Sequence, residues 1–468
     1  MKKPCFSAFL LLSLSSLLVV EGCAGGGKSV QAPQGSCQER VVKLAVLPFK
    51  NSSPNPSNDW LGHIAADLLT NSLRNTCGVS VISAAYTVSF FNKVGLIKTE
   101  DEVDGGFQGL RDLGAQAIIV GEHSFDGTRV KLKAAVVQAE TGMALITVTE
   151  ENHIVQTSNL FADLTVKILD AVNKTILSAH PGMKQVALRS KPVVPTVKSF
   201  ESFAKFGSCA YALEWYEIDK AISDCARSAE LDPTFWQAKI MLSRAYIENG
   251  KPMQTKRWLS DGATGAKQSG DAYLQGLSFM LTSHLTYSVT QIKENSDLLA
   301  KAISIYRFSG MDIPLAEALV DLADHYGQVA FLDQVDDILR KDWVKMSESL
   351  LPEAKGILSR DKDFLAEARY YAAESLFRKK DEKLSLLRAA VDSANRGVSA
   401  GATVGEGPVL LVKLNLSLAE KLLESGDKAG ALQAVADAEE AAVKYRVKKT
   451  AVFDPTARIS SLRNKLGN

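Results

Sequence analysis

The sequence predicts an α/β domain followed by an all-α solenoid of helical repeats. Up to about residue 178, strand-like segments rich in Val, Ile and Leu alternate with amphipathic helices. From about residue 199 onward the strand signals disappear, and apolar residues recur at helical spacing. We therefore expect a signal peptide at 1–22, a tether at 23–40, the α/β domain at 41–178, a linker at 179–198 and the repeats at 199–468.

The composition excludes several classes of protein. The chain has 468 residues, with 54 Lys and Arg against 53 Asp and Glu, and 46% of its positions are hydrophobic. Because the charges nearly balance and no long basic run occurs, the sequence gives no reason to expect a nucleic-acid partner. A disordered chain would be less apolar. The length and composition fit two or three globular domains.

The N-terminal residues have the pattern of a secretory signal. Lys2 and Lys3 precede residues 6–20, which are apolar or Ser and too few for a comfortable membrane span. The following Val20-Glu21-Gly22-Cys23 resembles the lipobox of bacterial lipoproteins, with Glu21 departing from its usual pattern. The resemblance implies cleavage before Cys23, a diacylglyceryl thioether on its sulfur and an N-linked acyl chain such as palmitate. Ordinary secretory cleavage is the alternative.

Two further features of this segment concern location and chemistry. Ala24 is not the Asp that retains lipoproteins in the inner membrane of enteric-type bacteria, so the resemblance implies the outer membrane, facing the periplasm. Gly22–Ser29 also satisfies the phosphate-loop pattern G-x-x-x-x-G-K-[ST]. Pro33 and Gly35 exclude the helix that such a loop needs after it. We therefore interpret residues 23–40 as a Gly-rich tether behind a lipid anchor.

The α/β domain is predicted from alternating strand and helix signals. A strand is predicted within residues 41–49, which close with Pro48 as the end of a strand often does. The turn-forming loop Asn51–Asn58 follows. One apolar helix face comes next, made by Leu61, Ile64, Ala65, Leu68, Leu69 and Leu73. The remaining elements are a strand at 79–82, a helix end and buried strand at 109–121, a hairpin at 129–137 and 144–149, and a closing helix at 160–177.

Three stretches of this domain resemble the N-terminal domain of the periplasmic TolB protein and its relatives. They read "LAVLPFKN", "VSVIS" and "LGAQAIIVGEHSFDGTRVKLKAAVVQAETG". The resemblance covers less than a third of the chain. It implies a mixed sheet with helices that serves as an interaction or sensory module.

A ligand of this domain would lie at the carboxyl ends of the strands, which the loop Asn51–Asn58 would line. Its Asn, Ser and Pro side chains offer no acid, base or nucleophile, so we interpret the loop as a turn. His63 follows on the helix and is expected to be a partly exposed helix residue.

The cysteines permit two disulfides in an oxidising periplasm. Cys37 precedes the first strand and Cys77 follows the first helix, so both lie at one edge of the sheet and a bridge is expected. Cys209 and Cys225 occupy facing positions on the helices of the first repeat, either as free buried thiols or as a bridge. No C-x-x-C spacing occurs and the six His are scattered, so no metal site is predicted.

The segment Ser199–Pro233 resembles a tetratricopeptide repeat. Small residues at Ala221 and Ser228 let two helices cross closely, and "AELDP" ends the unit. A second instance follows at Leu242, Ser243, Tyr246 and Gly250. A third lies downstream at Leu418, Ala419, Leu422, Gly426, Ala431 and Ala438. Between them we expect helices near 271–287, 295–307, 314–326, 329–347, 362–379 and 382–396. A generic helical solenoid is the alternative.

The aromatic residues of the first repeats have helical spacing, so most of them are expected in the core, and any on the concave face would anchor peptides. They are Phe200, Phe203, Phe206, Tyr211, Trp215, Tyr216, Phe235 and Trp236. Acidic pairs such as Asp336-Asp337 and Glu439-Glu440 are interpreted as solvated helix faces, not as catalytic pairs.

Taken together, these patterns indicate a lipid-anchored envelope protein without catalysis, cofactor or metal. We expect it to act as a scaffold or accessory factor that binds envelope proteins through its repeats and its α/β domain. The alternative is a periplasmic sensor that binds a small molecule or glycan in the α/β crevice. The sequence leaves the partner's identity and the oligomeric state open.

Overall fold

The structure is a computed structural model that describes residues 42–90, 107–178, 192–194, 197–285, 290–332, 335–450 and 452–467. The predicted signal peptide, the tether with Cys23 and Cys37, and most of the linker lie outside these residues. Among the helices in the described ranges, none combines the length and the apolar character needed to cross a membrane.

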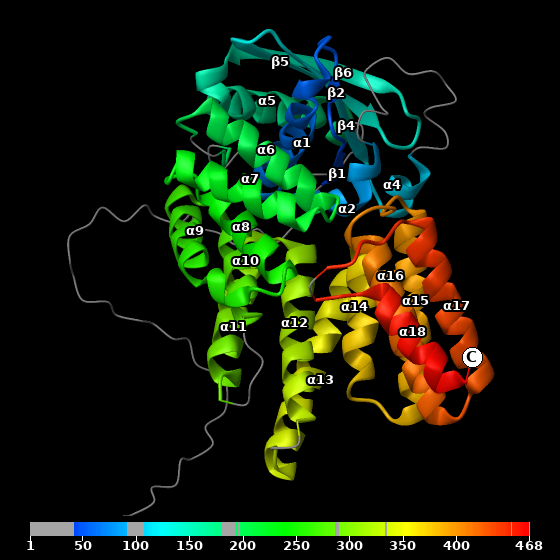
Figure 1. The fold of residues 1–468 in the computed structure, drawn as a ribbon. Helices are drawn as coiled ribbons and strands as arrows, with labels where there is room; N and C mark the ends of the chain where they lie inside the picture. The colour runs from blue at the N-terminus through cyan, green and yellow to red at the C-terminus, as the bar shows by residue number, and fades with distance from the viewer. Residues whose placement is uncertain are drawn as a thin grey trace, which may run out of the picture. The chain divides into compact units, whose positions relative to one another are not determined.

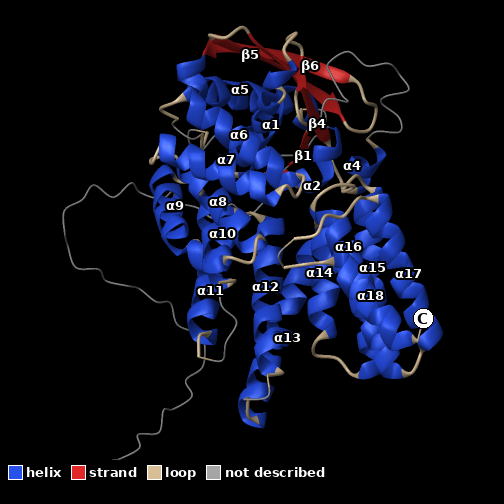
Figure 2. Cartoon of the chain, in the orientation of Figure 1, coloured by secondary structure: helices blue, strands red, loops and turns tan. Residues whose placement is uncertain are grey.

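The N-terminal part contains one mixed β-sheet, drawn in red in Figure 2. Its strand order is β3-β1-β4-β5-β6. Strands β1, β3 and β4 run parallel, and β4, β5 and β6 are antiparallel. The short strand β2 pairs in parallel with β4, along the same edge of β4 that pairs with β1. The strands are β1 (Val42–Val46), β2 (Lys50–Asn51), β3 (Val79–Val81), β4 (Ala117–Phe125), β5 (Arg129–Gln138) and β6 (Ala144–His153).

Helices cover both faces of the sheet. Alternation along β1 sends Leu44 to one face, where α1 and α5 pack, and Ala45 to the other, where α2 and α4 pack. These helices are α1 (Trp60–Arg74), α2 (Ala84–Thr87), α4 (Gln108–Asp112) and α5 (Thr157–Val172). Short helical turns are η1 (Pro56–Asn58), η2 (Val88–Phe90), η3 (Ile154–Gln156) and η4 (Asn173–Leu177). The predicted α/β region is therefore present.

The rest of the described chain is a stack of antiparallel helix pairs, a helical solenoid (Figure 1). The first three pairs are α6 (Phe200–Glu214) with α7 (Ile218–Leu231), α8 (Trp236–Glu248) with α9 (Lys256–Ser269), and α10 (Ala272–Ser283) with α11 (Ile292–Ser309). The next three are α12 (Asp312–Ala330) with α13 (Asp337–Arg360), α14 (Phe364–Ser375) with α15 (Lys380–Ser399), and α16 (Glu406–Ser425) with α17 (Lys428–Lys444). The turn η5 (Pro252–Gln254) precedes α9, and α18 (Pro455–Leu466) packs on α16 and α17.

The residues that suggested repeats from the sequence lie where two helices cross. Ala221 and Ser228 of α7 are fully buried, and the hydroxyls of Ser202 and Ser228 each donate to the other residue's carbonyl oxygen at 2.8 Å. In the last pair Ala431 and Ala438 are likewise fully buried. Gly426 ends α16 with a φ of +88°, a conformation that only glycine adopts readily.

One predicted helix has the wrong boundaries. The sequence suggested a helix at 329–347, whereas α12 ends at Ala330 and α13 runs from Asp337 to Arg360. Asp336 starts α13 because its carboxylate accepts hydrogen bonds from the backbone of Ile338 and Leu339. The helix also continues through Pro352, a residue that normally ends helices.

The α/β part and the first repeats share one hydrophobic core. Phe203 and Phe206 of α6 and Phe235 are fully buried in the same cluster as β1, α1 and α5. The Trp60 ring on α1 lies 5.8 Å from the rings of both Phe200 and Phe203. The described linker residues also join this core, through Val194 and Val197, and Figure 1 shows α1 between the sheet and α6. Of the eight aromatic residues expected to be mostly core, Phe203, Phe206, Phe235 and Trp236 are buried, and the other four are partly exposed.

More distant repeats also contact the α/β part. The buried ammonium of Lys43 on β1 lies 2.6 Å from the carboxylate of Asp361, at the turn between α13 and α14. The Tyr86 hydroxyl donates to Asp363, the N-cap of α14, at 2.9 Å. The first and last helix pairs meet as well, since Lys448 lies 3.2 Å from Glu217. The α/β part is therefore fastened to the solenoid at its first helix pair and again between the fourth and fifth pairs.

Candidate functional site

The first helices of successive pairs carry a connected set of half-exposed charged residues, which we call the charged face. Helix α1 of the α/β part contributes Asp67 and Arg74. The solenoid contributes Glu214, Arg244, Glu248, His284, Glu317, Asp321, Asp324, Arg369, Glu406 and Lys413. Side chains in its ion pairs keep 21% to 34% of their surface exposed, so they line accessible space and are not sealed in a core.

Helix α1 is held against the solenoid by polar contacts next to the charged face. The Asn71 and Asn75 amides donate to the carboxylate of Asp271 at 2.7 and 3.1 Å. Asp271 also caps α10 by accepting from the backbone of Leu274 at 2.9 Å. The Arg74 guanidinium lies over the Tyr273 ring at 4.1 Å. One end of α1 is therefore anchored to the start of α10.

Ion pairs connect several helices along the charged face. Arg369 on α14 pairs with Glu317 on α12 at 2.9 Å and with Glu406 at the start of α16. His284 lies 3.2 Å from Asp321, and Arg244 lies 3.8 Å from Glu214. Each of the six helix pairs in the described residues thus contributes a side chain to an ion pair that joins two helices.

Electrostatic effects show that the charged face brings distant helices together. Burial and, to a smaller extent, the nearby Glu214 carboxylate together raise the pKa of Asp67 to about 6. Burial likewise raises the pKa of Asp324 to about 6, together with Asp321. Burial lowers the pKa of Lys413 on α16, and Glu248 on α8 acts in the opposite direction. Glu248 and Lys413 therefore influence each other although they lie on the second and sixth helix pairs.

Acidic groups predominate on the charged face. Seven carboxylates stand against four permanent cations, Arg74, Arg244, Arg369 and Lys413. The carboxylates are Asp67, Glu214, Glu248, Glu317, Asp321, Asp324 and Glu406. A surface with this excess of negative charge attracts cations at physiological pH.

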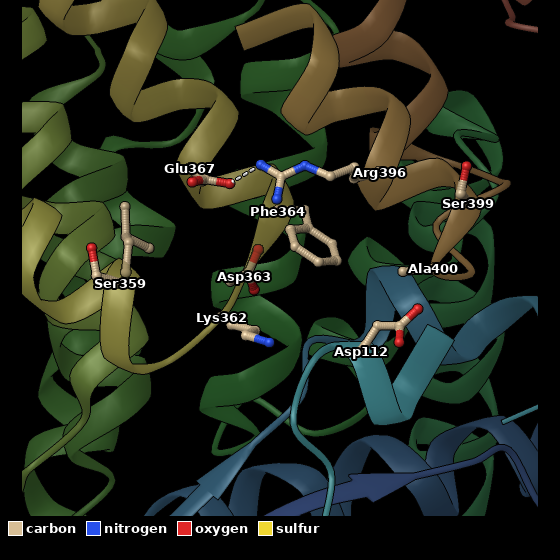
Figure 3. Close-up of a pocket in the computed structure, with 10 residues that line it drawn as sticks. Asp112, Ser359, Lys362, Asp363, Phe364, Glu367, Arg396, Ser399 and Ala400 are labelled. Atoms are coloured by element: carbon tan, nitrogen blue, oxygen red, sulfur yellow. Dashed lines mark hydrogen bonds and ion pairs between the residues drawn. The ribbon is translucent and has the colours of Figure 1, made fainter. Parts of the chain in front are cut away.

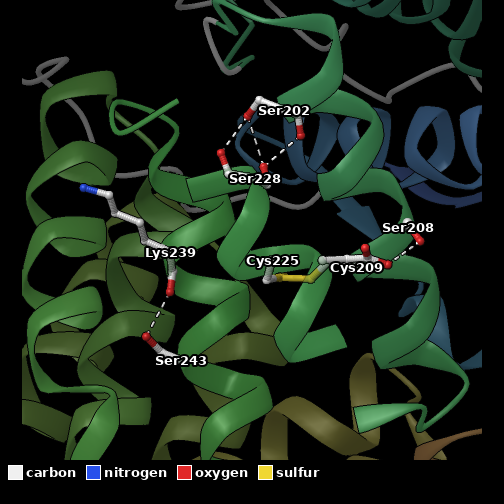
Figure 4. The surroundings of a disulfide bond; sticks show 8 residues. Ser202, Ser208, Cys209, Cys225, Ser228, Lys239 and Ser243 are labelled. Atoms are coloured by element: carbon white, nitrogen blue, oxygen red, sulfur yellow. Dashed lines mark hydrogen bonds between the residues drawn. A yellow bond between two sulfur atoms is a disulfide. The ribbon is translucent and has the colours of Figure 1, made fainter. Parts of the chain in front are cut away.

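Of the two predicted disulfides, the one between Cys209 and Cys225 lies within the described residues. Cys209 and Cys225 form a disulfide between α6 and α7, with 5.2 Å between their Cα atoms (Figure 4). Both residues are fully buried, so the bridge fastens the first helix pair from inside. Cys77 lies after α1, whereas Cys37 and the lipidation candidate Cys23 lie outside the described residues.

The loop Asn51–Asn58 forms a largely exposed turn, while the residues beside it are closely packed. The Asn51 amide donates to Asp59 at 2.7 Å, and Asn55 caps η1. A Cβ atom on Gly62 would lie 1.8 Å from the carbonyl oxygen of Phe49 and 2.9 Å from the His123 ring. The carboxyl-end region beside this loop is therefore filled by the chain itself.

The expectation for His63 is wrong. His63 is 5% exposed and meets the Tyr211 ring edge-on, with 5.5 Å between ring centroids. Burial lowers its pKa to about 4. The helix pattern alone suggested exposure because the sequence does not show that α6 covers this face of α1.

A cavity of about 450 Å³ lies between α4 and the helices α13 to α15 (Figure 3). Lys362 and Asp112 line its lower part, and the Arg396 guanidinium lies 4.6 Å from the centre of the Phe364 ring and pairs with Glu367. The full lining is Asp112, Leu358, Ser359, Lys362, Asp363, Phe364, Glu367, Arg396, Ser399 and Ala400. Of the His, Cys, Asp and Glu in the described ranges, no three or more are grouped as metal ligands.

The charged face was not predicted, because acidic residues on helices were interpreted as solvated helix faces. One signal could have revealed it. Glu317, Asp321 and Asp324 follow at spacings of four and three, so they share one face of α12. The convergence of six such helices and α1 is a tertiary property that no local pattern contains.

Comparisons with known proteins define no family for the chain. No protein-family model matches it, and no curated protein matches it. The apo form of RapI has a TM-score of 0.42 at 12% identity, covering 63% of this chain and 97% of RapI. The Cut9–Hcn1 hetero-tetramer of the APC/C gives 0.35 at 14%, covering 64% and 46% of the two chains. The TPR2AB domain of yeast Sti1 in its pHSP90 complex gives 0.23 at 14%, covering 57% and 98%. At these TM-scores the neighbours do not define the fold, which follows from the helix pairs themselves.

Proposed function

We propose that the protein is a lipid-anchored scaffold of the bacterial cell envelope that binds protein partners through its helical repeats. One observation carries this proposal. Half-exposed charged side chains from the first helices of the solenoid converge on a single face, although they come from both ends of its sequence. A face of this kind offers many weak polar contacts to a partner and no activated nucleophile.

The envelope location in this proposal is supported by the lipobox-like Val20–Cys23 behind an apolar run. The disulfide between Cys209 and Cys225 is consistent with it, because stable disulfides form in oxidising compartments such as the periplasm. The lipid anchor would keep the solenoid within reach of membrane-associated partners.

Two measurements test the proposal. Membrane fractionation should recover the wild-type chain with membranes, and Cys23→Ser should release it into the soluble fraction. If the variant sediments unchanged, the anchor is wrong. Crosslinking in intact cells, followed by purification of the full chain, should recover a protein adduct that maps to residues 199–468. If every adduct maps to the α/β part, the assignment to the repeats is wrong.

A further inference from the structure

Two buried amides lie on the helix faces that carry the charged residues. On α8, Gln237, Met241, Arg244 and Glu248 follow at spacings of four, three and four, so they share one stripe. Gln237 is 2% exposed, and within the described part of the chain neither its amide oxygen nor its nitrogen has a hydrogen-bond partner. An unpaired buried amide is costly and calls for an explanation.

The second amide belongs to α1. Asn71 lies between Asp67 and Arg74 on one stripe of that helix, and it is 8% exposed. Its amide nitrogen donates to Asp271, whereas its oxygen has no partner among the described residues. Free amide oxygens and nitrogens are the complement of a peptide group, which offers one donor and one acceptor.

The charges on the charged face are satisfied unequally. Each of its four permanent cations has a partner: Arg244 and Arg369 are in ion pairs, and Arg74 and Lys413 lie over aromatic rings. By contrast, Asp67 and Glu248 form no ion pair within the described residues. The unmatched groups are therefore negative, and a cationic partner would complement them.

We infer that the charged face binds a segment of a partner protein that carries Lys or Arg side chains. Asp67 and Glu248 would hold the cationic side chains, and Gln237 and Asn71 would pair with the peptide backbone. This inference rests on the proposed function and adds the chemical class of the partner. An acidic segment would meet seven carboxylates with no free cation to receive it, so the structure disfavours it.

The test measures binding of synthetic peptides to the full chain in detergent at pH 7.5. Two peptides of equal length in a Gly-Ser background carry either three Lys or three Glu. We expect the Lys peptide alone to bind, and to bind more weakly at high salt because screening shortens the range of the attraction. Glu248→Gln and Asp67→Asn should each weaken binding by about fivefold to tenfold. Glu294→Gln is the matched control, an exposed acid of α11 outside the charged face, and should leave binding unchanged.

A second variant separates binding from folding. Gln237→Met keeps the length of the side chain and removes the unpaired amide, so it should raise the thermal midpoint of the free protein while weakening the peptide complex. Binding of the Glu peptide, or equal losses for Glu248→Gln and Glu294→Gln, would overturn the inference. If neither peptide binds while crosslinking still maps a partner to the repeats, the cationic class is wrong and the proposed function stands.

Discussion

The ion pair between Lys43 and Asp361 gives the sharpest test of how the α/β part is joined to the repeats. Its side chains are 3% and 0% exposed, and the two residues are 318 positions apart. The Lys43 ammonium also donates to the carbonyl oxygen of Lys362 at 2.8 Å, and Ser80 donates to Asp361 at 3.0 Å. The Lys43 ammonium and the Asp361 carboxylate therefore both have hydrogen-bond partners inside the protein.

Lys43→Met removes the cation and leaves the Asp361 carboxylate buried without the ammonium that lies 2.6 Å from it. Breaking a buried pair in this way typically costs about 3–5 kcal/mol of unfolding free energy. In Lys43→Met/Asp361→Asn the unpaired charge is gone, so most of this loss should be recovered. Lys174→Met, which makes the same change in an exposed pair on the surface, should cost less than about 1 kcal/mol.

Urea unfolding of the purified chain, followed by tryptophan fluorescence and circular dichroism, measures these differences. A loss below about 1 kcal/mol for Lys43→Met would contradict the reasoning, because a pair this deeply buried cannot be broken so cheaply. A double variant as unstable as the single one would also contradict it, since the loss would then not come from the uncompensated carboxylate.

Three further predictions concern the disulfide, the packing of α4 and a buried histidine. Cys209→Ser/Cys225→Ser should lower stability by about 3 kcal/mol, since the bridge spans 16 positions, and reductant should shift the urea midpoint of the wild type but not of the variant. Gly109→Ala should lower the free energy of unfolding by about 1–3 kcal/mol, because its Cβ would lie 2.3 Å from the carbonyl oxygen of Ala400. The control Gly356→Ala on α13 meets no atom within 4 Å and should raise the free energy of unfolding by about 0.5–1 kcal/mol. Equal effects of the two substitutions would refute the close contact at Gly109. The pKa of His63 falls from 6.5 to about 4 on folding, so its contribution is complete above pH 6.5 and is lost as the pH falls toward 4. His63→Gln should therefore lose less stability than the wild type between pH 7 and pH 4, by up to about 3 kcal/mol, and parallel pH curves would exclude a buried neutral imidazole.

Local sequence patterns were enough to predict most elements of the fold. The hairpin β5–β6 follows from alternation of apolar and polar residues, and Ala221, Ser228, Ala431 and Ala438 mark helix crossings. Local signals do not fix the helix ends where they conflict with one another. Pro352 suggests a break inside α13, and only its surroundings in the fold show that the helix continues.

Contacts between distant segments could not be predicted. The exposure of His63 depends on α6, and the pairing of Lys43 depends on the turn between the fourth and fifth helix pairs. A single sequence does not reveal such pairings because each residue type is ordinary in its local context. The charged face was missed for the same reason, since the significance of Asp67 and Glu248 arises only when α1 and α8 face the same space.

Photo-crosslinking in living cells from position 248 tests the central claim most directly. A benzophenone amino acid replaces Glu248 on the charged face or, as the control, Glu294 on α11. We predict a discrete protein adduct from position 248 and none from position 294, with Lys or Arg close to the attachment point in the crosslinked segment. An adduct from position 294 alone, or none from either position, would contradict the account.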